Sequence, residues 1–167
     1  MIRSALVAAV VGLSLLGGCK ETEVRYVMIS EIVEHSSQLH VPVPVGYAAR
    51  DLGDRLYLTE TALKRGSVSL EFAVLDAAPA ETDAAEIETR TLTSGDTAQS
   101  RVTKRDGGNG GPEYTLEVWR SATRDGAPAW IYLAAHTQRQ RGEPDFTLSW
   151  AVFEATDLGR TSALITE

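Results

Sequence analysis

Alternation of apolar and polar residues is the dominant pattern along the chain. In residues 66–76 every second side chain is apolar: Val68, Leu70, Phe72 and Val74. Residues 112–122 repeat the pattern with Tyr114, Leu116 and Val118. A period of two predicts strands that bury one face against a core and turn the other face outward.

Two further segments, 129–137 and 145–154, are apolar at both odd and even positions. Strands of this kind are covered on both faces, so the pattern predicts two strands that lie centrally or between layers. Turn-rich segments at 122–128 and 137–145 separate these strands from each other and from the strand over 112–122. The spacing predicts an antiparallel meander of three strands.

Two segments have the features of sheet edges. Residues 86–106 predict a polar hairpin that turns at Ser94-Gly95-Asp96, and their low apolar content is typical of an edge or a projecting ribbon. Residues 38–52 alternate well, but Pro42 and Pro44 lack amide donors. The prolines therefore predict an edge strand or an extended lead-in.

The remaining elements are short. Residues 23–37 are expected to begin as a strand and finish as a helix, and residues 55–60 to form another strand. Helices are expected at 77–89, which is rich in Ala and Glu, and at 59–66. Together these elements predict an α+β, β-dominated fold with a curved antiparallel sheet, one or two short helices and a single domain.

The first residues have the layout of a secretory signal peptide. Arg3 supplies a positive charge, residues 5–16 are apolar, and Gly17 and Gly18 are small residues that suit a cleavage site. A membrane-spanning helix needs about 20 apolar residues. The shorter run found here therefore indicates export rather than a permanent span.

Leu16-Gly17-Gly18-Cys19 resembles the lipobox of bacterial lipoproteins. The resemblance implies cleavage between Gly18 and Cys19 and a covalent lipid on the sulfur of Cys19, with no other cofactor. Lys20, where an aspartate would retain the protein at the inner membrane, implies a lipid anchor in the outer membrane, on its periplasmic face. The alternative is an ordinary secretory signal followed by a free thiol.

These signals divide the chain into three parts. We expect a signal peptide at 1–18, a short tether at 19–23 and a β-rich domain at 24–167. The domain resembles the PsbP/DcrB-like α+β domains in the order of its elements and in Val43-Pro44-Val45-Gly46-Tyr47, a Pro-Xaa-Gly-aromatic turn after a short strand. The resemblance implies a curved antiparallel sheet but no function, because a fold does not determine a function.

Charge and cysteine content narrow the range of partners. The chain has 16 basic and 23 acidic residues and a formal net charge of −7. Nucleic-acid binding needs clustered Lys and Arg, so this balance argues against a nucleic-acid partner. Cys19 is the only cysteine, so the domain uses no disulfide and must be stabilised by packing.

The histidines offer little chemistry. His136 alternates with Trp130 and Tyr132 on an aromatic strand face, where it is a base, a ligand or, as we expect, a hydrogen-bonded core or interface histidine. Glu34, His35 and His40 do not have the spacing of a zinc site. We therefore predict no metal site and no catalytic site.

Three polar segments are open to two interpretations each. The glycine-rich stretch 106–114 either cradles an anion or a calcium ion or, as we expect, forms a flexible connection between strands. The acids of 80–88 either meet a basic partner or form a solvated face. Arg139 and Arg141 either contact an acidic partner or lipid head groups, or are ordinary solvated side chains.

The first functional hypothesis is a non-enzymatic lipoprotein that binds a protein partner at the cell envelope. Its role is either that of an accessory to an envelope assembly or that of an immunity protein that neutralises an incoming toxin. Small acidic chains with a lipobox and without catalytic motifs resemble such immunity proteins in general character. The membrane would be reached only through the lipid anchor.

Two other functions remain open. A small apolar ligand would bind in a pocket lined by aromatic residues of the sheet, Trp130, Tyr132, Trp150 and Phe153. An enzyme would need His136 beside a carboxylate and a nucleophile in one cleft. The residues that we predict to contact a ligand or partner are Trp130, Tyr132, His136 and Trp150.

Overall fold

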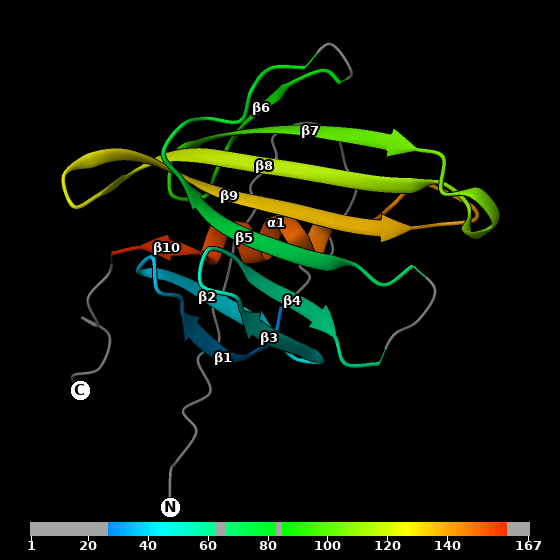
Figure 1. Ribbon diagram of the computed structural model, residues 1–167, viewed down its shortest axis with the longest axis horizontal. Helices are drawn as coiled ribbons and strands as arrows, with labels where there is room; N and C mark the ends of the chain where they lie inside the picture. Colours follow the sequence, from blue (N-terminus) through cyan, green and yellow to red (C-terminus); the bar gives the residue numbers. More distant parts are fainter. Residues whose placement is uncertain (1–26, 63–65, 83–84, 160–167) are drawn as a thin grey trace, which may run out of the picture.

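The computed structural model describes residues 27–62, 66–82 and 85–159 (Figure 1). In these residues the chain forms two antiparallel sheets and one α-helix, α1 (Thr147–Ala155). The expected α+β, β-dominated fold is therefore confirmed. No helix in the described part of the chain is both long and apolar enough to cross a membrane.

The larger sheet contains seven strands in the order β3-β4-β5-β9-β8-β7-β6. Their bounds are β3 (Tyr47–Asp51), β4 (Leu56–Glu60), β5 (Ser69–Leu75), β6 (Glu88–Thr91), β7 (Thr97–Arg105), β8 (Glu113–Arg124) and β9 (Ala127–Gln138). β8 and β9 have 12 residues each and run side by side along the middle of the sheet (Figure 1). This sheet is the frame on which the candidate sites are built.

The smaller sheet has the order β1-β2-β10, with β1 (Ile29–Glu34), β2 (Leu39–Pro44) and β10 (Asp157–Leu158). In Figure 1, α1 lies behind the large sheet. Side chains from β2 and α1 join those from the large sheet in one buried cluster, which includes Leu39, Val41, Leu70, Phe72, Leu116, Ile131, Leu133, Val152 and Phe153. The core therefore lies on one face of the large sheet, and the opposite face is turned outward.

The turns join strands as the sequence predicted. Asp125 and Gly126 connect β8 to β9 with φ angles of 52° and 80°, the conformation of a type I′ hairpin turn. β6 and β7 form the polar hairpin, closed by hydrogen bonds between Leu92 and Asp96 and between Gly95 and Leu92. β6 is one of the two edge strands of the large sheet, as its composition indicated.

The prediction of a third meander strand over 145–154 is wrong, because this segment forms α1. An apolar run without alternation does not distinguish a buried strand from a buried helix. The carboxylate of Asp145 accepts a hydrogen bond from the backbone N–H of Thr147 at 3.0 Å, which satisfies a donor of the first turn. Ser149, Val152 and Phe153 then face the core at helical spacing.

The helices expected at 59–66 and 77–89 are also wrong wherever the structure describes them. Residues 59–60 end β4, and the described part of 77–87 is an irregular connection that leads into β6. Residues 63–65 and 83–84 lie outside the described residues. Ala and Glu content is a weak prior for a helix, and tertiary context overrides it here.

The segment 23–37 is a strand followed by a turn rather than by a helix. β1 ends at Glu34, and the turn is closed by two hydrogen bonds between His35 and residues 38–39. Gln38 adopts a φ of 66°, so the chain reverses directly into β2. Residues 23–26 and the predicted signal peptide and tether lie outside the described residues.

The two prolines of β2 lie where only one strand flanks them. β2 is central in the small sheet, but β10 pairs with it only at Leu39 and His40. Pro42 and Pro44 face β1 alone. The edge character predicted from the missing amide donors therefore holds for this half of the strand.

Candidate functional site

The outward face of the large sheet carries a polar depression of about 460 Å³, here called the outer groove. It is lined by alternate residues of β7, β8 and β9 and by one residue of the β5–β6 connection: Thr82, Arg101, Thr103, Arg105, Glu113, Thr115, Glu117, Tyr132 and His136. Tyr132 and His136, two of the four predicted contact residues, therefore lie in one groove. They are brought together by the period of two along β9.

An ion pair lies at the centre of the outer groove. The carboxylate of Glu117 accepts hydrogen bonds from Arg101 Nε at 2.5 Å and Nη2 at 3.1 Å, and from the hydroxyl of Tyr132 at 2.8 Å. Arg101 Nη1 also donates to the carbonyl of Ala80 at 2.6 Å, which ties the β5–β6 connection to the sheet. The side chains of Arg101 and Glu117 are 9% and 17% exposed, so the pair is largely removed from water.

The electrostatics of this pair follow from its contacts. Burial opposes the charge of Glu117, but hydrogen bonds from Arg101 and Tyr132 hold the pKa of its carboxyl below the ordinary value. Burial and the hydrogen bond to Glu117 raise the pKa of the Tyr132 hydroxyl. Glu117 is therefore an ionised acceptor and Tyr132 a neutral donor at neutral pH.

Trp119 continues the ordered surface along β8. Its indole Nε1 donates to the side-chain oxygen of Gln99 at 2.8 Å, and the guanidinium of Arg101 lies 5.5 Å from its ring centroid. Trp119 is 2% exposed although it lies on the outward face. The centre of the groove, around Arg101, is thus held in place by hydrogen bonds and ring contacts.

Sequence reasoning missed Arg101 and Glu117. The available signal was the alternation of charge in residues 101–105 and 113–117, which become cross-strand partners once β7 and β8 are paired. Arg101 is opposite Glu117 in that register. The register depends on the connection at 106–112, whose length is not evident from hydrophobic pattern alone.

His136 lies between a hydroxyl and a carboxylate. Its Nδ1 is 3.0 Å from the hydroxyl of Thr115, and its Nε2 is 3.9 Å from a carboxylate oxygen of Glu71. Glu71 also pairs with Arg55. Burial is the main cause that lowers the pKa of His136, so the imidazole is neutral at neutral pH.

This order of groups resembles a nucleophile, a base and an orienting carboxylate. The floor beneath Thr115 and His136 is the paired ladder of β5, β9 and β8, in which backbone N–H groups bond neighbouring strands. Oxyanion stabilisation needs N–H donors that point into the cleft. The paired ladder therefore supplies no such backbone donors beneath Thr115 and His136.

The aromatic pocket expected for a small ligand does not form. Trp130 and Tyr132 project from the outward face of β9, whereas Trp150 and Phe153 lie on α1 at the opposite face of the sheet. Phe153 is fully buried and meets the ring of Trp150 edge-to-face at 6.4 Å. Arg90 covers the Trp150 ring at 4.5 Å, so these two aromatics belong to the core and its margin.

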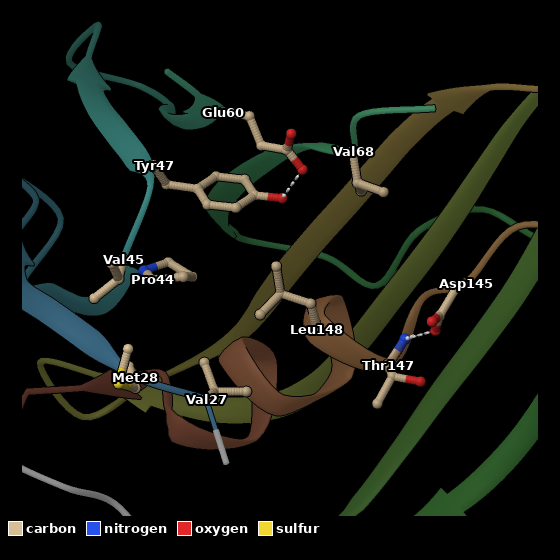
Figure 2. A pocket seen from close by; sticks show the side chains of 10 residues that line it. All are labelled: Val27, Met28, Pro44, Val45, Tyr47, Glu60, Val68, Asp145, Thr147 and Leu148. Carbon is tan, nitrogen blue, oxygen red and sulfur yellow. Dashed lines mark hydrogen bonds between the residues drawn. The ribbon is translucent and has the colours of Figure 1, made fainter. Parts of the chain in front are cut away.

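A second cavity of about 440 Å³, here called the apolar groove, lies between the β2–β3 turn and the start of α1 (Figure 2). Its lining residues are Val27, Met28, Pro44, Val45, Tyr47, Glu60, Val68, Asp145, Thr147 and Leu148. Tyr47 crosses it and donates to Glu60 at 3.1 Å. Met28 and Val45 are 66% and 54% exposed, so the rim is apolar and open.

His35, which the sequence places near Glu34 and His40, has a structural contact in the folded chain. His35 is buried and its Nδ1 contacts the carboxylate of Asp51 at 2.8 Å. The backbone N–H of Gly53 and the ring of His35 hold the pKa of Asp51 below its ordinary value. His35 therefore fastens the β1–β2 turn to the end of β3.

Comparison with known proteins gives two findings. Residues 40–157 match the family model of the type six secretion immunity 3 domain. The chain is also 32% identical over 146 residues to the protein named Immune protein Tsi3 of Pseudomonas aeruginosa, an alignment that covers 87% of this chain and 92% of that protein. The family match includes all of β2 except Leu39, all strands of the large sheet and α1.

Proposed function

Because the chain belongs to the type six secretion immunity 3 domain family, we propose that it protects the cell that makes it by binding and neutralising a toxin delivered by type VI secretion. The family match over residues 40–157 is the observation that carries this proposal. Of the roles considered from sequence, it favours the immunity protein over an accessory to an envelope assembly. It also favours a protein partner over a small apolar ligand.

The surface supports binding of a folded partner. The Arg101–Glu117–Tyr132 network holds polar groups in fixed positions before any partner arrives. Groups that are already ordered lose little conformational freedom on association, which favours affinity. The cross-strand pairs of β7, β8 and β9 make the outer groove such a surface.

We include export and lipid anchoring at Cys19 in the proposal. The support is Leu16-Gly17-Gly18-Cys19 after a short apolar run. Several acyl chains on one cysteine hold a protein stably at a membrane, because each buried CH₂ contributes about 0.8 kcal/mol. An anchor at the outer membrane would keep the immunity protein in the periplasm, where it would meet an incoming toxin.

Competition between sibling bacteria tests the immunity function. A strain that lacks this gene is mixed with its parent, which carries an active type VI secretion system. We expect the parent to kill the deletion strain and a plasmid copy of the gene to restore survival. Killing should disappear when one effector gene is deleted from the attacker, and that effector is then the cognate toxin. Equal survival of the deletion strain and its parent would contradict the proposal.

The anchor is tested separately, so that its failure is distinct from failure of immunity. The intact mass of the protein from native membranes should correspond to a chain that begins at residue 19 and carries two or three acyl chains. Cys19→Ser should abolish the added mass and release the protein from the membrane fraction. An unmodified thiol on a chain recovered in the soluble fraction would contradict lipidation and leave toxin binding to be judged by competition alone.

A further inference from the structure

Two segments that the sequence analysis treated separately form the walls of one cavity. The glycine-rich connection between β7 and β8 and the residues that follow β9 meet near the start of β5, at the right-hand end of the large sheet in Figure 1. The cavity has a volume of about 680 Å³, and we call it the loop cavity. It is lined by Gly66, Ser67, Asn109, Gly110, Gln138, Arg139, Gln140 and Arg141.

Close packing fixes the glycine-rich wall. A Cβ atom at Gly111 would lie 2.7 Å from the carbonyl oxygen of Arg139 and 2.9 Å from the Cα of Gln140. The side-chain nitrogen of Gln138 donates to the carbonyls of Gly107 and Gly111 at 3.4 and 3.3 Å. The segment is the connection between strands that its sequence predicted, with positive φ angles at Gly108 and Gly111. Its glycines also permit a close approach to a neighbouring backbone.

The other wall presents two guanidinium groups. Arg139 is held in place: its backbone N–H donates to the carbonyl of Pro112 at 3.1 Å and its Nη1 to the carbonyl of Glu143 at 2.7 Å. The guanidinium of Arg141, by contrast, forms no hydrogen bond or ion pair with any residue that the structure describes. One arginine thus shapes the cavity while the other has donors available to a partner.

The charge of the lining differs from that of the chain. The two arginines are the charged residues among those that line the loop cavity, whereas the whole chain has a formal net charge of −7. Side-chain amides of Gln138, Gln140 and Asn109 supply further polar groups. A guanidinium fork matches the two oxygens of a carboxylate, and charge-assisted bonds of this kind are roughly twice as strong as neutral ones.

We propose that the loop cavity binds a carboxylate-bearing segment of the toxin, with Arg141 as the contacting cation and Arg139 as the positioning residue. This inference rests on the proposed function and names the part of the surface that would bind the toxin. A basic site on an acidic protein also selects against other acidic partners that do not fit the cavity, because the rest of the surface repels them.

A protein partner explains the lining better than a lipid surface does. Recognition of anionic lipids uses clusters of about four to eight Lys and Arg side chains. Among the residues that the structure describes, the lining of the loop cavity offers two, set in a recess beside uncharged amides. Binding to anionic lipid vesicles is measured as well, so that a lipid head-group site can be distinguished from a toxin site.

The experiment measures the affinity of the membrane-purified protein, in detergent, for the effector identified by the competition assay. Arg141→Gln is the primary variant, because Arg141 supports no other described side chain, and Arg139→Gln/Arg141→Gln is the second. The control is Arg50→Gln/Lys104→Gln, which removes the same charge from exposed positions of β3 and β7. Circular dichroism and thermal melting establish that each variant is folded.

We expect Arg141→Gln to weaken binding by about tenfold and the double variant by more, while the control changes affinity by less than about threefold. The difference should become smaller as salt is raised from about 50 to 300 mM, because screening weakens exposed charge pairs. Equal losses in the double variant and the control would overturn the inference and assign the effect to net charge.

Two further outcomes would also overturn it. Unchanged toxin affinity in the folded Arg141→Gln and double variants would leave the immunity function standing and place the toxin elsewhere on the surface. If the protein instead cosediments with phosphatidylglycerol vesicles and Arg139→Gln/Arg141→Gln alone abolishes this, the loop cavity is a lipid head-group site. If the effector does not bind the wild-type protein, both the inference and the proposed function fail.

Discussion

Replacing Glu117 by leucine should leave a buried guanidinium without its carboxylate. In the folded chain Glu117 accepts three hydrogen bonds, two from Arg101 and one from Tyr132, and both members of the ion pair are largely buried. Removing one partner of a buried pair costs about 3–5 kcal/mol. Because the Glu117 side chain is 17% exposed, water can partly compensate Arg101 for the missing carboxylate. We therefore expect the free energy of unfolding to fall by about 3 kcal/mol.

The matched double variant separates the charge from the packing. Arg101→Leu/Glu117→Leu removes both charges together, and such replacements are often neutral or stabilising. We therefore expect it to be more stable than Glu117→Leu by at least about 2 kcal/mol. Glu113→Gln is the control, since Glu113 lies on the same strand and in the same groove without this network.

Urea denaturation at neutral pH, followed by tryptophan fluorescence, measures these free energies of unfolding. The pH dependence has a definite sign. The folded-state pKa of Glu117 is lowered, so the stability it provides is present above the unfolded-state pKa and is lost as pH falls through the folded-state pKa. The difference between wild type and Glu117→Gln should therefore be constant near pH 7 and shrink below about pH 4.

Two results would refute this reasoning. A Glu117→Leu cost of less than about 1 kcal/mol would show that the pair behaves as a solvated surface ion pair. A double variant that is as unstable as the sum of its single variants would show that the two residues do not interact.

Three further predictions concern packing and the outer groove. Gly111→Ala should destabilise the fold by at least about 2 kcal/mol, because a Cβ at this position, where φ is 85°, would meet neighbouring backbone. Gly95→Ala should cost only about 1 kcal/mol, because φ is similar at 91° but no atom lies within 4 Å of the added Cβ. Thermal melting compares the two variants, and equal costs would contradict the close-packing argument. Phe153→Ala should cost about 3–5 kcal/mol in urea denaturation because the side chain is fully buried, and a cost below about 1 kcal/mol would be inconsistent with this core. His136→Ala should change the free energy of unfolding by less than about 0.5 kcal/mol, since the His136 side chain is 47% exposed, but it should weaken binding of the cognate toxin if the outer groove is part of the interface. Titration against the toxin measures the affinity, with Thr115→Ala for comparison, and an unchanged affinity would exclude His136 from the interface.

Local pattern was enough to predict most strands. Residues 66–76, 112–122 and 129–137 form β5, β8 and β9, because alternation records which side of a strand is buried. The Asp125-Gly126 turn could also be predicted from local sequence, because few residue pairs adopt two successive positive φ angles. The candidate contact residues Tyr132 and His136 could be placed on one face for the same reason.

Local pattern failed where tertiary contacts decide the conformation. Residues 145–154 are apolar enough for a buried strand or a buried helix, and packing of Val152 and Phe153 into the space behind the sheet selects the helix. The same choice places Trp150 on the opposite side of the sheet from Trp130, which removes the aromatic pocket that the alternative ligand-binding function requires.

The sequence by itself determined a β-dominated domain with a lipobox-like start, and its similarity to an immunity family indicates the class of partner. Only the tertiary structure showed that Arg101 meets Glu117 and that the glycine-rich loop meets Arg139 and Arg141. These contacts join residues that lie 16 or more positions apart in the chain. Strand register and loop packing bring them together, and neither is encoded in the periodicity of a single segment.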